Sequence, residues 1–174
     1  VKQIETEHLS FSYPGGNSAL RDVTLSVEPG EFVTLCGISG CGKSTLLRLL
    51  KPGIQPRGEV GGRILLNGRE LPAQPDSRTA AAVGFVMQDP EAQTVTDKVW
   101  HELAFSCESV GLPRGEIRRR VGEMACYFGL EELFGRDTST LSGGQKQLLC
   151  LASAAALHPE ILLLDEPASQ LDPV

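Results

Sequence analysis

The first 36 residues carry a strand-like pattern of hydrophobic and polar positions. Ile4, Thr6, Leu9 and Phe11 indicate a first strand. Residues 20–27 alternate apolar and polar side chains, which is typical of a strand with one buried face, and the turn-forming sequence 14–17 lies between the two. A short, mostly apolar run at 31–36 follows, and we expect a further strand there. This part of the chain is therefore predicted to be β-rich.

The middle of the chain changes from strand-like to helical patterns. Residues 55–62 are rich in glycine and charge and predict a loop, whereas 83–87 form a compact apolar run that fits a buried strand. Between about 99 and 128, apolar residues recur with helical spacing in two segments separated by Gly111-Leu112-Pro113. This pattern predicts a helical subdomain, at about 89–141, inserted between strands.

The last part of the chain predicts a helix followed by a buried strand. The nearly apolar stretch 148–157 has helical spacing and leads to His158-Pro159, so His158 is expected in the C-terminal turn of that helix. Residues 161–164 are continuously apolar, as in a parallel strand covered on both faces. No apolar stretch approaches the ~20 residues that span a bilayer, so we expect no direct insertion into a membrane.

Composition narrows the class of protein. The chain has 41% hydrophobic and 22% charged residues, as ordinary globular domains do, and its formal charge is −6. This acidic balance gives no electrostatic argument for a nucleic-acid partner. The five cysteines are odd in number and lack CxxC spacing, which argues against a disulfide framework or a zinc site. We therefore expect one globular domain with reduced thiols.

A phosphate-binding motif lies between the expected strand at 31–36 and a helix-like run. It fits the pattern GxxxxGK[ST] and reads Gly37-Ile38-Ser39-Gly40-Cys41-Gly42-Lys43-Ser44. Glycines let backbone N–H groups turn toward phosphate oxygens, Lys43 adds a mobile positive charge, and Ser44 offers a hydroxyl to Mg²⁺. The alternative is a plain glycine-rich turn. We expect a nucleoside triphosphate here, and we expect Cys41 to react with alkylating reagents.

Polar side chains follow two of the expected strands at their C-terminal ends. Gln88 comes directly after 83–87, and Asp165 and Glu166 come directly after 161–164. Parallel α/β sheets bind their ligands at this edge. Two carboxylates there are costly unless a cation or a catalytic task uses them. Gln88 alone is better explained as a capping or loop residue, since turns commonly use polar side chains.

Two more candidates lie outside the strand ends. Ser142 is a good helix N-cap, and the glycines that follow it expose N–H groups to an anion, so 141–145 would form a second phosphate-binding helix end. Tyr13 stands before the turn at 14–17, where its ring could stack on a base. An aromatic residue that only packs is the ordinary alternative for Tyr13.

In this order the motifs resemble those of the ATP-binding cassette (ABC) ATPases, over essentially the whole chain. The resemblance rests on 37–44, Gln88, LSGGQ at 141–145, ILLLDE at 161–166 and 169–172. It implies an α/β fold with a P-loop NTPase (RecA-like) core, an N-terminal antiparallel β subdomain and an inserted α-helical subdomain. The whole chain, 1–174, would then be one nucleotide-binding domain.

The resemblance also implies a role for each motif. Glu166 would be the general base for the attacking water, with Lys43 and Gln88 also catalytic, and Mg²⁺ would be held by Ser44, Gln88 and Asp165. The residues implied to bind ATP are Tyr13, Gly37, Ile38, Ser39, Gly40, Cys41, Gly42, Lys43, Ser44, Thr45, Ser142, Gly143, Gly144 and Gln145. In the family, LSGGQ closes over the ATP of the opposite cassette in a head-to-tail dimer, so the expected partner is a second cassette, identical or different.

The sequence around Gln88 favours one branch of the family. Gln88-Asp89-Pro90, Gln93 and 169–173 look like the cassettes of energy-coupling factor importers, which take up vitamins or cobalt and nickel ions. This resemblance implies a peripheral protein on the cytoplasmic face of the cell membrane that partners integral membrane transport subunits. Soluble cassettes of translation, DNA-maintenance ATPases and a fragment that binds ATP without turnover are the alternatives. The DNA-maintenance class places a long coiled coil between the motifs, and this chain has no sustained heptads.

One family feature has no counterpart in the sequence. The histidine that follows the final core strands in the family is absent, since the chain stops at Val174 and His8, His101 and His158 lie elsewhere. We therefore expect a C-terminally truncated cassette, whose hydrolytic competence depends on residues after Val174.

Overall fold

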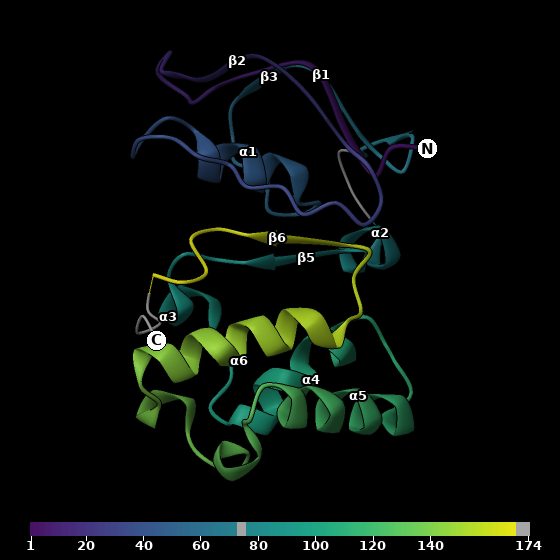
Figure 1. Ribbon diagram of the computed structural model, residues 1–174, viewed down its shortest axis with the longest axis vertical. Helices are drawn as coiled ribbons and strands as arrows, with labels where there is room; N and C mark the ends of the chain where they lie inside the picture. Colours follow the sequence, from purple (N-terminus) through teal and green to yellow (C-terminus); the bar gives the residue numbers. More distant parts are fainter. Residues whose placement is uncertain (73–75, 170–174) are drawn as a thin grey trace. The chain divides into compact units, whose positions relative to one another are not determined.

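The computed structural model describes residues 1–72 and 76–169. The chain forms two compact units, Val1–Asp76 and Ser77–Val174, which are described one at a time (Figure 1). The resemblance at 170–173 lies outside the described residues.

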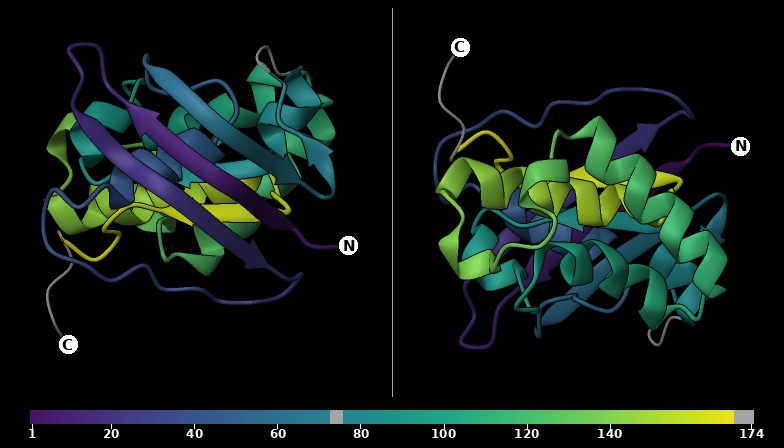
Figure 2. Two further views of the ribbon diagram at one scale, coloured as in Figure 1. Left: turned by 90° about the horizontal axis from the view of Figure 1, so that it is seen from above. Right: turned by 90° about the horizontal axis from the view of Figure 1, so that it is seen from below.

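The first unit contains a four-stranded antiparallel sheet with the order β2-β1-β3-β4, and Figure 2 shows its long strands side by side. The strands are β1 (Ile4–Ser12), β2 (Ser18–Val27), β3 (Glu59–Leu66) and β4 (Arg69–Glu70). The expected strands at 4–11 and 20–27 are confirmed. Their apolar positions are buried or half-buried, most completely at Leu9 and Phe11 of β1.

Helix α1 (Lys43–Leu50) belongs to the same unit. Leu46, Leu49 and Leu50 are its buried apolar positions. At its C-terminal end, Gln55 Nε2 donates a hydrogen bond to the Leu49 carbonyl oxygen at 3.0 Å, which satisfies one of the acceptors that a helix end leaves unpaired.

Two expectations for this unit are wrong. Residues 31–36 form no strand, and the Phe32 side chain is 89% exposed. A strand needs a neighbour for its backbone groups, and neither edge of this unit's sheet pairs with the segment. Conversely, the expected loop at 55–62 contributes Glu59 onward to β3, because backbone pairing with 10–12 of β1 depends little on side-chain type.

The second unit combines a parallel strand pair with helices. Strands β5 (Val83–Val86) and β6 (Ile161–Leu164) pair in parallel, and the other elements are α2 (Ser77–Ala81), α3 (Pro90–Gln93), α4 (Val99–Ser109), α5 (Arg114–Tyr127), the 3₁₀ turns η1 (Glu131–Leu133) and η2 (Thr138–Thr140), and α6 (Gly143–Ala156). Both strands and the three long helices were expected. Among the described residues, no helix has the length and apolarity needed to cross a membrane.

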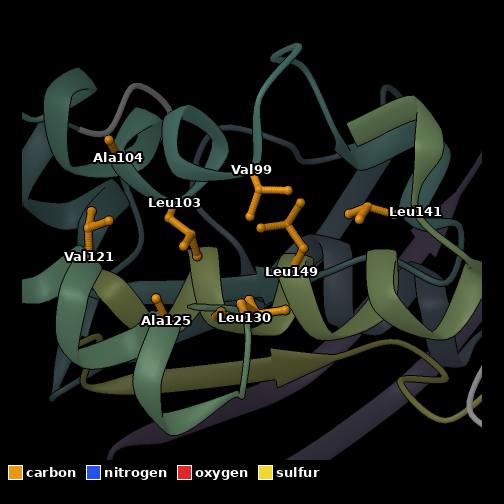
Figure 3. Close-up of a cluster of buried hydrophobic side chains, with 9 residues drawn as sticks. Val99, Leu103, Ala104, Val121, Ala125, Leu130, Leu141 and Leu149 are labelled. Atoms are coloured by element: carbon orange, nitrogen blue, oxygen red, sulfur yellow. The ribbon is translucent and has the colours of Figure 1, made fainter. Parts of the chain in front are cut away.

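A buried apolar cluster joins the three long helices (Figure 3). It brings together Val99 and Leu103 of α4, Val121 and Ala125 of α5, and Leu149 of α6. These residues repeat at helical spacing in the sequence, so the pattern that predicted the helices also predicted which faces they bury.

Two details of the last segment differ from expectation. Helix α6 ends at Ala156, and His158 lies just past it with a φ of 52°, because its backbone leaves the helix in the left-handed region. Strand β6 is not covered equally on both faces. Ile161 and Leu163 are buried on one face, whereas Leu162 on the opposite face is 43% exposed.

Substitution of Gly62 tests the bulge geometry in the sheet of the first unit. It has a φ of +81° and lies where β1 shifts its register against β3, and a Cβ there would overlap the carbonyl oxygens of Glu7 and His8. We expect Gly62→Ala to lower the free energy of unfolding by at least about 2 kcal/mol. Gly61→Ala is the matched control, since its Cβ would meet only Ser10 Cβ at an ordinary 3.7 Å. Denaturant unfolding that finds equal stabilities for both variants would contradict the bulge geometry.

Candidate active site

The phosphate-binding loop is held in shape by its own backbone. Gly40 and Gly42 have φ angles of 81° and 100°, in the left-handed region that favours glycine. Gly42 is also the N-cap of α1, and a Cβ on it would lie 2.6 Å from the Ala19 carbonyl oxygen. The glycine of the GK pair is therefore required both by the turn and by the strand β2 beside it.

Lys43 folds back over this loop. Its Nζ donates hydrogen bonds to the carbonyl oxygens of Gly37 at 2.8 Å and Ile38 at 3.1 Å. The first turn of α1, which begins at Lys43 and contains no acidic residue, adds the positive end of the helix dipole. The loop thus combines an ammonium group with helix N-terminal N–H groups, and both kinds of group attract anions.

Tyr13 is tied to the helix that follows the loop. Its hydroxyl lies 2.9 Å from Thr45 Oγ1, and its ring meets Phe11 edge-on with ring centroids 4.9 Å apart. Tyr13 also lines a cleft of about 340 Å³ together with residues 14–16, Gly58 and Glu59. The aromatic ring therefore stands beside helix α1, which follows the loop 37–42.

Gln88 and Glu166 are brought into contact by the register of the two parallel strands. Val86 pairs with Leu164, so Gln88 and Glu166 each follow the last paired residue by two positions. Gln88 Nε2 donates a hydrogen bond to Glu166 Oε2 at 2.7 Å. Two side chains 78 residues apart in sequence are thereby fixed at one strand edge.

The backbone around Glu166 is unusual. Glu166 has a φ of 49°, a left-handed conformation that a glutamate side chain adopts only at a cost of about 1–3 kcal/mol. The preceding Asp165 is buried, and its N–H donates to the Val86 carbonyl oxygen at 2.9 Å, which extends the strand pairing. Strain of this kind persists where surrounding contacts impose it, and such positions cluster at functional sites.

Ser142 and Gln145 form a capping box at the start of α6. Ser142 Oγ accepts from the Gln145 N–H at 3.3 Å, and Gln145 Oε1 accepts from the Ser142 N–H at 3.0 Å. The expected N-cap is therefore confirmed. The side chains of Ser142 and Gln145 are both used in the capping box. Gly143 and Gly144 have no side chains, so none of their own covers the backbone N–H groups at this helix end.

The expected magnesium ligands suit that ion chemically. Among the described residues, no group of three or more histidine, cysteine or acidic side chains could hold a metal. The expected set has one carboxylate, from Asp165, together with the hydroxyl of Ser44 and the amide oxygen of Gln88. Mg²⁺ prefers such oxygen ligands, in small number and completed by waters and phosphates, so the donor set fits it.

The structure groups the candidate residues in three places. The loop 37–44 with Tyr13 and Thr45 lies in the first unit, and the Gln88–Glu166 pair with Asp165 and the start of α6 lie in the second.

The sequence did not predict the contacts next to Gln88, where the Gln93 side chain binds the backbone at the end of strand β5. The Asp89-Pro90 pair, an N-cap followed by proline, was the available signal for the short helix α3.

Comparison with known proteins identifies the family. A family model described as "ABC transporter" matches residues 20–169. The chain belongs to this family. A Bacillus cereus protein named as an ABC transporter ATP-binding protein is 45% identical over 175 residues, which cover 100% of this chain and 32% of the relative. The chain thus spans about a third of the curated relatives that it matches.

Two solved structures have the same fold. One is cbiO1 from Clostridium perfringens, described as part of the ABC transporter complex cbiONQ, with a TM-score of 0.84, 31% identity and coverage of 99% of this chain and 68% of that one. The other is the ATP-binding cassette MJ0796 as a dimer in a post-hydrolysis state bound to ADP and Pi, with a TM-score of 0.81, 26% identity and coverage of 97% and 76%. The P-loop NTPase fold class of the ABC ATPases is confirmed.

Cys41 provides a test of the loop. Its side chain is exposed, and its Sγ lies over Gly37, only 2.7 Å from where a Cβ on that glycine would be. We expect iodoacetamide to modify Cys41 at neutral pH and the added group to abolish ATP binding, measured with a fluorescent ATP analogue. Unchanged ATP binding after complete modification would rule out the loop as the phosphate site.

The buried thiols serve as the internal control for that experiment. Burial raises the pKa of Cys150 to about 11 and raises the pKa of Cys107, so both stay protonated and unreactive at neutral pH. Mass mapping should therefore find these two cysteines unmodified until the pH approaches their raised pKa values. Early labelling of Cys150 would contradict its burial beneath α3.

Proposed function

We propose that this ABC domain binds and hydrolyses ATP, with residues 1–174 acting as one nucleotide-binding domain whose helical subdomain spans about 89–141. The observation that carries the proposal is the hydrogen bond between Gln88 and Glu166 at the ends of paired parallel strands. The resemblance to the family implies a glutamine that contacts Mg²⁺ and senses coupling to a transmembrane partner at the first position, and the general base at the second. In this proposal the loop 37–44 binds the phosphates of ATP.

The proposed reaction is transfer of the γ-phosphoryl group to water. Loop N–H groups and Lys43 bind the β- and γ-phosphates and stabilise the charge that develops on them. Glu166 accepts a proton from the attacking water, and Gln88 holds the Glu166 carboxylate in position through the 2.7 Å hydrogen bond. Ser44, Gln88 and Asp165 would hold Mg²⁺, which would supply charge neutralisation. Tyr13 stacks on the adenine.

The proposed working unit is a head-to-tail dimer of cassettes. Ser142, Gly143, Gly144 and Gln145 would then complete the ATP site of the second cassette rather than their own. Two features support this role: the α6 N-terminus is preformed by a capping box, and Gly143 and Gly144 leave its backbone N–H groups unobstructed by side chains. ATP binding closes the dimer and hydrolysis reopens it.

The proposed physiological role is to power an energy-coupling factor importer of a vitamin or a metal ion. The similarity to cbiO1, described as part of a transporter complex, supports this branch of the family, as does the sequence from Gln88 to Gln93. The proposed partners are integral membrane transport subunits, and the proposed location is the cytoplasmic face of the membrane.

The decisive variant for ATP hydrolysis is Glu166→Gln in the intact protein that contains this chain. The amide cannot accept the proton of water, so we expect kcat to fall by at least about 100-fold while ATP binding is retained. The unreacted ATP should hold the dimer closed, so gel filtration with Mg-ATP should show dimers that the wild type does not accumulate.

Lys43→Ala is the complementary variant, because it should lose ATP binding itself and therefore form no ATP-dependent dimer. Turnover by Glu166→Gln at the wild-type rate, or turnover by a monomer, would refute the proposed function.

A further inference from the structure

The Gln93 side chain binds backbone groups of the two residues that flank Val86, the last residue of strand β5. Its Nε2 donates to the Phe85 carbonyl oxygen at 3.1 Å, and its Oε1 accepts from the Met87 N–H at 2.7 Å. The orientation of the amide is fixed by chemistry, since a carbonyl oxygen only accepts and a backbone N–H only donates. Both ends of the side-chain amide are therefore used.

This arrangement copies the hydrogen bonding of a parallel strand. In a parallel ladder, one residue donates to the carbonyl before its partner and accepts from the N–H after it. The Gln93 amide does the same to the residues that flank Val86. On its other edge Val86 pairs with Leu164 of β6, and its carbonyl accepts from the Asp165 N–H. The end of β5 is thus bound from two sides.

The position of this contact matters because Gln88 follows immediately. Met87 is the residue between the strand and Gln88, and its N–H is held by Gln93. Fixing Met87 restricts the direction in which Gln88 leaves the strand. Gln88 then reaches Glu166 Oε2 at 2.7 Å, a contact that a small rotation at Met87 would break.

Gln93 is itself anchored to α6. It lies in α3, whose N-cap Asp89 accepts from the Glu91 N–H at 2.9 Å. Glu91 forms an ion pair with Lys146, a buried side chain one position past the capping box of α6. Cys150 Sγ also lies 3.8 Å from the Pro90 carbonyl oxygen. Helix α3 is therefore held to α6 at two points.

We propose that Gln93 is a positioning residue that sets Gln88 against Glu166, with α3 as its rigid support on α6. The inference rests on the proposed function of Gln88 and Glu166. Because α3 is fixed to the helix that begins with Ser142, Gln93 also makes the Gln88 turn and the α6 start move as one body. Gln93 does not touch the nucleotide in this role.

A double-mutant cycle in the intact protein tests the proposal. Gln93→Met removes both hydrogen bonds at nearly constant volume, and we expect kcat for ATP to fall at least about tenfold with the KM for ATP changed less than about twofold. In a Gln88→Ala background the same substitution should cause no further loss of kcat, because Gln93 acts through Gln88. Gln93→Glu, which keeps the acceptor for Met87, repeats the test if Gln93→Met fails to fold.

Gln55→Met is the matched control, since the Gln55 side-chain amide also donates a hydrogen bond to a backbone carbonyl oxygen, that of Leu49 at 3.0 Å, and Gln55 has no contact with Gln93 or Gln88 in that bond. It should lower the melting temperature comparably and leave kcat unchanged. A wild-type kcat in folded Gln93→Met, or an equal loss of kcat in the Gln88→Ala background, would overturn the positioning role. If Gln88→Ala and Glu166→Gln both leave kcat unchanged, the proposed function itself fails. Failure of the proposed function is therefore distinguishable from failure of the positioning role of Gln93.

Discussion

The register of the parallel pair β5 and β6 is the constraint on which the proposed hydrolytic chemistry depends. Pairing Val86 with Leu164 makes both strands end level, so the residues two positions later meet. A shift of one residue would turn the side chains to opposite faces and separate Gln88 from Glu166. All four residues of β5 are buried, so the strand whose end carries Gln88 belongs to the packed interior of its unit.

Backbone groups, rather than long-range charge, organise both candidate clusters. In the first unit, glycines with positive φ let the loop carbonyls turn toward the Lys43 ammonium group. In the second, Glu166 occupies a left-handed conformation and α3 binds the strand end through one glutamine amide. Such short-range contacts are rigid and little screened by salt, which suits sites that bind a highly charged ligand.

The sequence predicted elements whose signals are local. The prediction of strands at 4–11 and 20–27 depends only on nearby residues, as does the helical spacing of Leu103 and Val121 with their neighbours. The choice of Ser142 as an N-cap is equally local. The strand expected at 31–36 failed because a strand also needs a partner edge, which local pattern does not contain. The role of Gln93 was hidden for the same reason, since a polar residue near a turn has many local explanations.

The most direct test of the account is a structure of the Glu166→Gln protein with Mg-ATP bound. The account predicts one nucleotide whose phosphates lie in the loop 37–44, with Gln88 at the magnesium ion and residue 166 beside the attacking water. It also predicts Ser142 of the second cassette at the γ-phosphate. A nucleotide bound at the loop with Gln88 and residue 166 remote from its γ-phosphate would contradict the central claim that these residues act on one ATP.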